Sequence, residues 1–156
     1  MAEKPLPTYE KLTVGEELGP MYVDITERKV KDYAYAVDDR TALCSTGTGI
    51  APALLLCNDL MNVIYAQYSS VGGQGLHAKQ DFEILNPTRI GKRVKIVGRV
   101  ADKYEKREKR WMVTWASAVD EDGVELIRGN TTETRGSPGG VKGSGPSDKP
   151  AAESGP

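Results

Sequence analysis

Very few side chains in this sequence are of the types that carry out acid–base or nucleophilic chemistry. His77 is the only histidine, and Cys44 and Cys57 are the only cysteines. A histidine or a carboxylate such as Asp39 serves as a general acid or base, and a thiolate serves as a nucleophile. Each candidate also has a structural alternative. Asp39 would cap a loop, Cys44 would be a small half-buried residue, and His77 would be a strand residue.

The same scarcity argues against the common metal sites. Cys44 and Cys57 lack the spacing of zinc ligands, and a single histidine does not complete a Cys/His ligand set. Two cysteines do not indicate a disulfide framework either, and Cys57 lies in an apolar run that places it in the core. We therefore expect no metal and no cofactor.

Composition and charge also restrict the partners. The 156 residues are 38% hydrophobic and 28% charged, with a net charge of −1 and no field of one sign to attract nucleic acid. No run approaches the roughly 18 apolar residues of a membrane span. The N-terminus carries no apolar signal-peptide core. We expect a cytoplasmic protein with neither a nucleic-acid nor a membrane partner.

The chain divides into three parts by composition. Residues 135–156 are dominated by Gly, Pro, Ser and Ala. They cannot bury enough apolar surface to offset the entropy lost on ordering, so we predict a disordered tail. Residues 1–11 form an N-terminal extension. Residues 12–134 have the length of one domain with one core.

Two helices are predicted in the first half of that domain. Thr26 is a suitable N-cap for a short amphipathic helix over Glu27–Val37, and a weak strand over Met21–Ile25 precedes it after a loop. A loop over Asp38–Gly49 leads to a longer helix over Pro52–Tyr68. This second helix is apolar on nearly every face, which is typical of a buried helix.

The second half alternates between apolar and polar residues, as antiparallel strands do. In one strand Val94, Ile96, Gly98, Val100 and Asp102 share a face, and in the next Trp111 shares a face with Trp115. The turn Glu121-Asp122-Gly123 indicates a hairpin. One long helix followed by strands predicts an α+β fold in which a curled antiparallel sheet wraps the helix. The predicted strands are Leu76–Leu85, Val94–Tyr104, Arg110–Asp120 and Val124–Thr134.

Several short motifs, in this order along the chain, resemble the MaoC-like and FAS1-like acyl dehydratases. No single motif is specific, and the order of all of them carries the resemblance, which covers about residues 12–134. It implies a hot-dog fold, the α+β arrangement described above. The motifs are Val14-Gly15-Glu16-Glu17-Leu18, the helix end Tyr33–Asp39, Arg89–Val94, Gly98–Glu105 and Asp120–Gly123.

In active members of that family, an Asp and a His activate the water that adds across a 2-enoyl thioester. They lie in a Gly-Asp-x-Asn-Pro-Leu/Ile-His segment after the short helix. Carried onto this chain, the Asp is Asp39 and the His position is Cys44, while Thr41 and Ala42 replace Asn and Pro. A thiol of pKa about 8.5 is a poor base near pH 7, so the motif is degenerate.

The resemblance also implies a backbone N–H at the start of the central helix that polarises the thioester carbonyl. The usual His-Gly is Pro52-Ala53 here, so Ala53 retains an N–H while Pro52 has none. Ala53 and Leu54 are the predicted substrate-binding residues.

The resemblance therefore predicts the acyl-tunnel subunit of a two-part enoyl-CoA hydratase or 3-hydroxyacyl dehydratase. It would bind an acyl-CoA or acyl carrier protein thioester and form a homodimer or a heteromer with a related catalytic hot-dog subunit. Two alternatives stay open. One is a complete enoyl-CoA hydratase that uses Asp39, with His77 as an unusual partner. The other is a hot-dog thioesterase, for which Asp59 is the candidate carboxylate on the helix.

Overall fold

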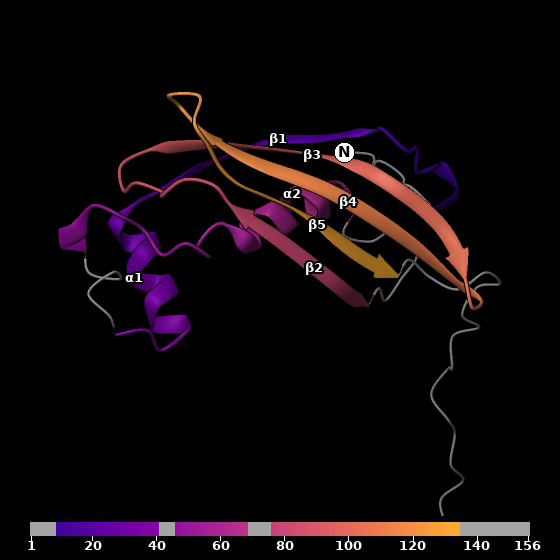
Figure 1. Ribbon diagram of the computed structural model, residues 1–156, viewed down its shortest axis with the longest axis horizontal. Helices are drawn as coiled ribbons and strands as arrows, with labels where there is room; N and C mark the ends of the chain where they lie inside the picture. Colours follow the sequence, from indigo (N-terminus) through magenta and orange to yellow (C-terminus); the bar gives the residue numbers. More distant parts are fainter. Residues whose placement is uncertain (1–8, 41–45, 69–75, 135–156) are drawn as a thin grey trace, which may run out of the picture.

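The computed structural model describes residues 9–40, 46–68 and 76–134. Its antiparallel sheet has the strand order β1-β3-β4-β5-β2 and curls over helix α2 (Figure 1). The predicted α+β class and hot-dog arrangement are confirmed. Cys44 and the predicted tail over 135–156 lie outside the described residues. The elements are η1 Tyr9–Lys11, β1 Glu17–Asp24, α1 Glu27–Ala36, η3 Thr46–Thr48, α2 Cys57–Tyr68, β2 His77–Ile84, β3 Arg93–Lys106, β4 Lys109–Asp120 and β5 Glu125–Thr134.

The core lies between α2 and the concave face of the sheet. From α2, Leu60, Val63 and Ile64 are buried against the strands, whereas Asn58 on the opposite side of the helix is exposed. The alternation of β3 and β4 supplies the other wall, because every second side chain points inward. The inward residues of these two strands are Val94, Ile96, Val100, Met112, Ala116 and Ala118. Within the described ranges, none of the helices has the length and apolar character needed to span a membrane.

A β-bulge in β3 corrects one expectation about side-chain direction. Val100 lies opposite Thr114 and Asp102 lies opposite Val113, so Ala101 is the extra residue. A bulge shifts the following residues to the other face of the sheet. The prediction that Asp102 shares a face with Val100 is therefore wrong, and Asp102 is exposed.

Strand β1 begins earlier than the sequence predicted. The sequence predicts a loop over Leu12–Pro20, yet residues 17–20 belong to an edge strand with a register shift between Leu18 and Met21. An edge strand tolerates a proline because its outer N–H groups need no partner in the sheet. Leu18 is buried in the core, which fixes this end of the strand.

Helix α2 begins later than predicted. Its first α-helical residue is Cys57 rather than Pro52. Before it, the Leu55 N–H donates to the Pro52 carbonyl at 3.0 Å and the Cys57 N–H donates to the Leu54 carbonyl at 3.1 Å. These three-residue spacings form tight turns rather than an α-helix. Residues 53–56 therefore make a turn that leads into the helix. The side chains of Leu55 and Leu56 are still buried in the core, as they would be at the start of a buried helix.

Candidate functional site

An apolar pocket lies beside the turn that leads into α2, and we call it the α2 pocket. Its volume is about 310 Å³. One wall comes from the segment before α2, and the other comes from the end of β2 and the residues that follow. The lining residues are Ile50, Ala51, Pro52, Ala53, Ile84, Leu85, Asn86, Pro87 and Thr88.

Backbone hydrogen bonds hold the two walls together. The Ala51 N–H donates to the Thr88 carbonyl at 2.8 Å, and the Ile90 N–H donates to the Gly49 carbonyl at 3.0 Å. Between these bonds Ile50 and Arg89 form an antiparallel bridge. The segments around Ile50 and Arg89, nearly forty residues apart in sequence, are thus fixed side by side. This pairing gives the pocket a defined shape.

Of the two predicted substrate-binding residues, Ala53 lines this pocket and Leu54 does not. Leu54 follows Ala53 in the chain, and its apolar side chain is 51% exposed. Within the described part of the chain, the N–H groups of Leu55 and Cys57 donate to carbonyl oxygens, whereas those of Ala53 and Leu54 have no hydrogen-bond acceptor. Free backbone donors beside an apolar cavity can polarise a carbonyl oxygen.

Asp39 follows the C-terminal end of α1. Its N–H donates to the Ala34 carbonyl at 2.9 Å, and Asp38 before it has a φ of 51°, so the two residues close the helix with a left-handed turn. The Asp39 side chain is half-buried. Helix α1 contacts η3, and η3 directly precedes the segment that lines the α2 pocket.

His77 lies at the opposite end of the sheet from the α2 pocket. It is an exposed residue at the start of β2, whereas Ile84 at the end of the same strand lines the pocket. Seven residues of extended strand correspond to roughly 23 Å. Within one chain, the structure does not bring His77 together with Asp39 or Ala53. Cys44 lies outside the described residues.

Asp59 is the acidic residue in the first turn of α2, and it has a partner. The Lys29 ammonium lies 2.9 Å from Asp59 Oδ2 and donates a hydrogen bond to Oδ1 at 3.2 Å. Sequence reasoning considered Asp59 alone and missed Lys29, which is thirty residues earlier. A long-range pair of this kind leaves no signal in a local pattern.

The Cys57 thiol has low reactivity in this environment. Burial raises the pKa of the Cys57 thiol to about 11, so the thiol stays protonated near neutral pH. The side chain is half-buried at the start of α2 and packs against the core. The sequence interpretation of Cys57 as a packing residue fits these surroundings. Among the described residues, no three His, Cys, Asp or Glu side chains form a metal-binding group.

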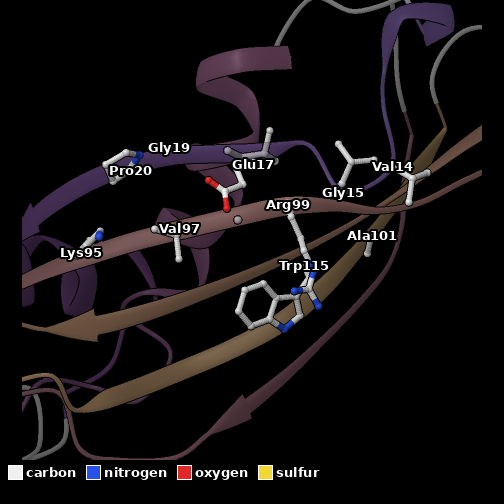
Figure 2. Close-up of a pocket in the computed structure, with 13 residues that line it drawn as sticks. Val14, Gly15, Glu17, Gly19, Pro20, Lys95, Val97, Arg99, Ala101 and Trp115 are labelled. Carbon is white, nitrogen blue, oxygen red and sulfur yellow. The ribbon is translucent and has the colours of Figure 1, made fainter.

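A larger hollow of about 750 Å³ lies on the outer face of the sheet, over β1, β3 and β4. Figure 2 shows Arg99 extending from β3 toward the Trp115 ring on β4, and its guanidinium carbon lies 4.8 Å from the ring centroid. The hollow is lined by Glu17 and Lys95 among others, but by none of the predicted site residues. Its lining includes the charged side chains of Glu17, Lys95 and Arg99, whereas no charged residue lines the α2 pocket, so the α2 pocket is the better candidate for an apolar ligand.

Comparisons with known proteins identify the fold. No family model matches the sequence, and no curated protein matches it. Among solved structures, the unliganded R-hydratase PhaJ1 from Pseudomonas aeruginosa has a TM-score of 0.68 at 18% identity, over 83% of this chain and 86% of its own. A monoamine oxidase regulatory protein from Archaeoglobus has a TM-score of 0.71 at 17% identity, over 85% and 97%.

A third similar structure is the HadBC 3R-hydroxyacyl-ACP dehydratase complex from Mycobacterium tuberculosis. Its TM-score is 0.65 at 17% identity, over 78% of this chain and 96% of that one. The chain shares the hot-dog fold with these proteins.

Proposed function

We propose that this chain binds the acyl group of a thioester in the α2 pocket and serves as the acyl-tunnel subunit of a two-part hydratase or dehydratase. The observation that carries the proposal is the position of the pocket. Ala53 lines an apolar cavity in the turn that leads into α2, and the N–H groups of Ala53 and Leu54 have no hydrogen-bond acceptor within the described residues. An acyl chain matches the cavity, and a thioester carbonyl matches the donors.

The open edge of the sheet supports a second subunit beside this pocket. Within residues 9–40, 46–68 and 76–134, β2 is an edge strand of the sheet, with no strand paired on its outer side. Its pairing with β5 runs without a shift from Lys79 to Ile84. The other edge, β1, carries Pro20 and a register shift, which hinder pairing with another strand. A partner strand along β2 would reach Ile84 and cover the open side of the pocket.

The partner in this proposal is a second copy or a related hot-dog subunit with an intact catalytic pair. The HadBC dehydratase and ChsH1-ChsH2, which share the fold, are complexes. The degenerate motif at Cys44 favours the related catalytic subunit, because a thiol is a poor base for activating water. The thioester would be carried by coenzyme A or an acyl carrier protein.

The complete hydratase remains the second candidate. Asp39 follows α1, and the contact of α1 with η3 ahead of the α2 pocket favours this alternative. His77, however, lies at the end of β2 that is far from the pocket. Hydration of crotonyl-CoA by the isolated chain, abolished by Asp39→Asn, would establish this alternative. The thioesterase alternative loses support because Lys29 holds the Asp59 carboxylate.

The binding proposal is tested with two matched variants. Ile84 and Leu76 are exposed apolar residues, 47% and 61%, near opposite ends of β2, and only Ile84 lines the pocket. We expect Ile84→Asp to weaken the binding of octanoyl-CoA at least about tenfold, since burying an aliphatic side chain's surface is worth roughly 1.5–3 kcal/mol. Leu76→Asp should leave the affinity unchanged.

Isothermal titration with octanoyl-CoA and free coenzyme A is the measurement. Wild-type affinity for octanoyl-CoA should exceed that for coenzyme A, and affinity should rise with chain length by up to about 0.8 kcal/mol per methylene until the pocket is full. Equal affinities for the two ligands, or equal effects of the two substitutions, would show that the α2 pocket is not an acyl site.

A further inference from the structure

We propose that Lys29 and Asp59 are a positioning pair that fixes the orientation of the carbonyl-binding N–H groups of Ala53 and Leu54, in the turn that leads into α2. The inference rests on the proposed function, because it assigns these residues a role in recognising the thioester. Neither residue belongs to the α2 pocket, and neither would touch the substrate.

The pair joins the first turns of two helices. Asp59 is 7% exposed and lies in the first turn of α2, and Lys29 lies in the first turn of α1. The Lys29 N–H also donates to the Thr26 side chain at 3.1 Å, which caps α1. The backbone of Lys29 is therefore held in place, and its ammonium reaches both oxygens of Asp59.

Helix stability alone does not account for this arrangement. A carboxylate in the first turn is already favoured by the helix dipole, so Asp59 stabilises α2 without a lysine. Partly buried ion pairs contribute little net stability, because desolvation of both charges offsets their attraction. What the lysine adds is a fixed distance between α1 and the start of α2.

That distance matters because the carbonyl-binding groups lie just ahead of Asp59. Ala53 and Leu54 are linked to the first turn of α2 by the tight turns at Leu55 and Cys57. Such turns transmit a rotation of the first helical turn to the N–H groups before it. An error of about 1 Å in a positioned donor is enough to weaken its interaction strongly.

The test compares two ligands that differ at the carbonyl. Octanoyl-CoA is a thioester, and S-octyl-CoA is the thioether that lacks the carbonyl oxygen. We expect the wild-type chain to bind the thioester at least about tenfold more tightly. The double variant Lys29→Met with Asp59→Leu removes both charges and should fold, because replacing both partners leaves no uncompensated buried charge. We expect it to bind both ligands with nearly equal affinity.

A matched control removes the same charges elsewhere on α1. Arg28 and Asp32 form an exposed pair, at 3.6 Å with 90% and 71% of the side chains exposed. The double variant Arg28→Met with Asp32→Leu should keep the wild-type preference for the thioester. Lys29→Arg should also keep it, since arginine preserves the charge and the reach.

The outcomes separate this inference from the proposed function. If the wild-type chain binds neither ligand, the proposed function fails and the positioning role fails with it. If the wild-type chain prefers the thioester and the Lys29/Asp59 double variant keeps that preference, only the positioning role is overturned. Should the apolar double variant not fold, Lys29→Met with Asp59→Asn takes its place with the same two outcomes.

Discussion

At the scale of single residues, the proposed function depends on backbone donors rather than on reactive side chains. The N–H groups of Ala53 and Leu54 have no acceptor among the described residues. His77 lies about 23 Å along β2 from the pocket. Asp39, which follows α1, is the acid–base candidate among the described residues. In the proposed function, this chain binds the acyl group and a partner subunit supplies the catalysis.

The raised pKa of Cys57 gives a prediction about pH. Burial raises the thiol pKa to about 11, so at pH 8 the protonated thiol dominates and the thiolate fraction is on the order of 0.1%. Alkylation of Cys57 by iodoacetamide should rise about tenfold per pH unit up to pH 10, whereas free cysteine levels off near its own pKa of about 8.5.

Mass spectrometry of the alkylated peptide that contains Cys57 follows this rate, with free cysteine as the control in the same buffers. A rate that levels off below pH 9 would mean that the thiol is more solvated than the structure shows.

At the scale of the elements, much of the fold could be predicted from local pattern. The Thr26 cap placed α1 correctly, and the apolar alternation placed β2 to β5 within a few residues. The errors have physical causes. Pro20 is untypical of a strand, yet it lies in the edge strand β1. Pro52 was interpreted as a helix start, although a tight turn follows it. The bulge at Ala101 places the Asp102 side chain on the opposite face of the sheet from the one predicted.

The candidate site was less predictable than the fold. Ala53 and Leu54 were identified through the family resemblance, but the opposite wall of the α2 pocket comes from residues 84–88. The ion pair of Lys29 with Asp59 also joins distant positions. Local periodicity gives the direction of a side chain and not its long-range neighbour, so neither the wall nor the pair could be predicted.

The cap of α1 leads to a prediction at this scale. Thr26→Ala removes the oxygen that accepts from the Lys29 N–H at 3.1 Å, so the free energy of unfolding should fall by about 1 kcal/mol. Urea unfolding followed by circular dichroism measures the change, and exposed Thr13→Ala is the control. An unchanged midpoint for Thr26→Ala would show that the cap does not stabilise the fold.

At the scale of the whole molecule, the open β2 edge and the exposed pocket are two aspects of one surface. Ile84 belongs to both, and its side chain is 47% exposed in the single chain. A partner strand along β2 would pair with the backbone groups on the side of β2 that no described strand covers, and it would exclude water from the pocket. An assembly of two hot-dog domains is therefore part of the proposed function.

Assembly predicts both the mass of the complex and the edge at which amide protons are protected. Light scattering after size exclusion should give about twice the chain mass of 16.9 kDa, or the mass of a heterodimer when a related catalytic subunit is co-expressed. Hydrogen exchange in residues 79–84 should slow as concentration rises, while residues 19–22 of β1 should not change. Slower exchange in β1 rather than in β2 would show that the interface lies at the β1 edge, and it would contradict the proposed pairing along β2.

The most direct test of the account asks where an acyl chain lies on this protein. Octanoyl-CoA with a diazirine at the end of the chain is irradiated with the full-length protein, and the cross-linked peptides are mapped by mass spectrometry. The α2 pocket predicts labels in residues 50–53 and 84–88, lost in Ile84→Asp and kept in Leu76→Asp. Labels on Trp115 and residues 95–101, in the hollow on the outer face of the sheet, would contradict it.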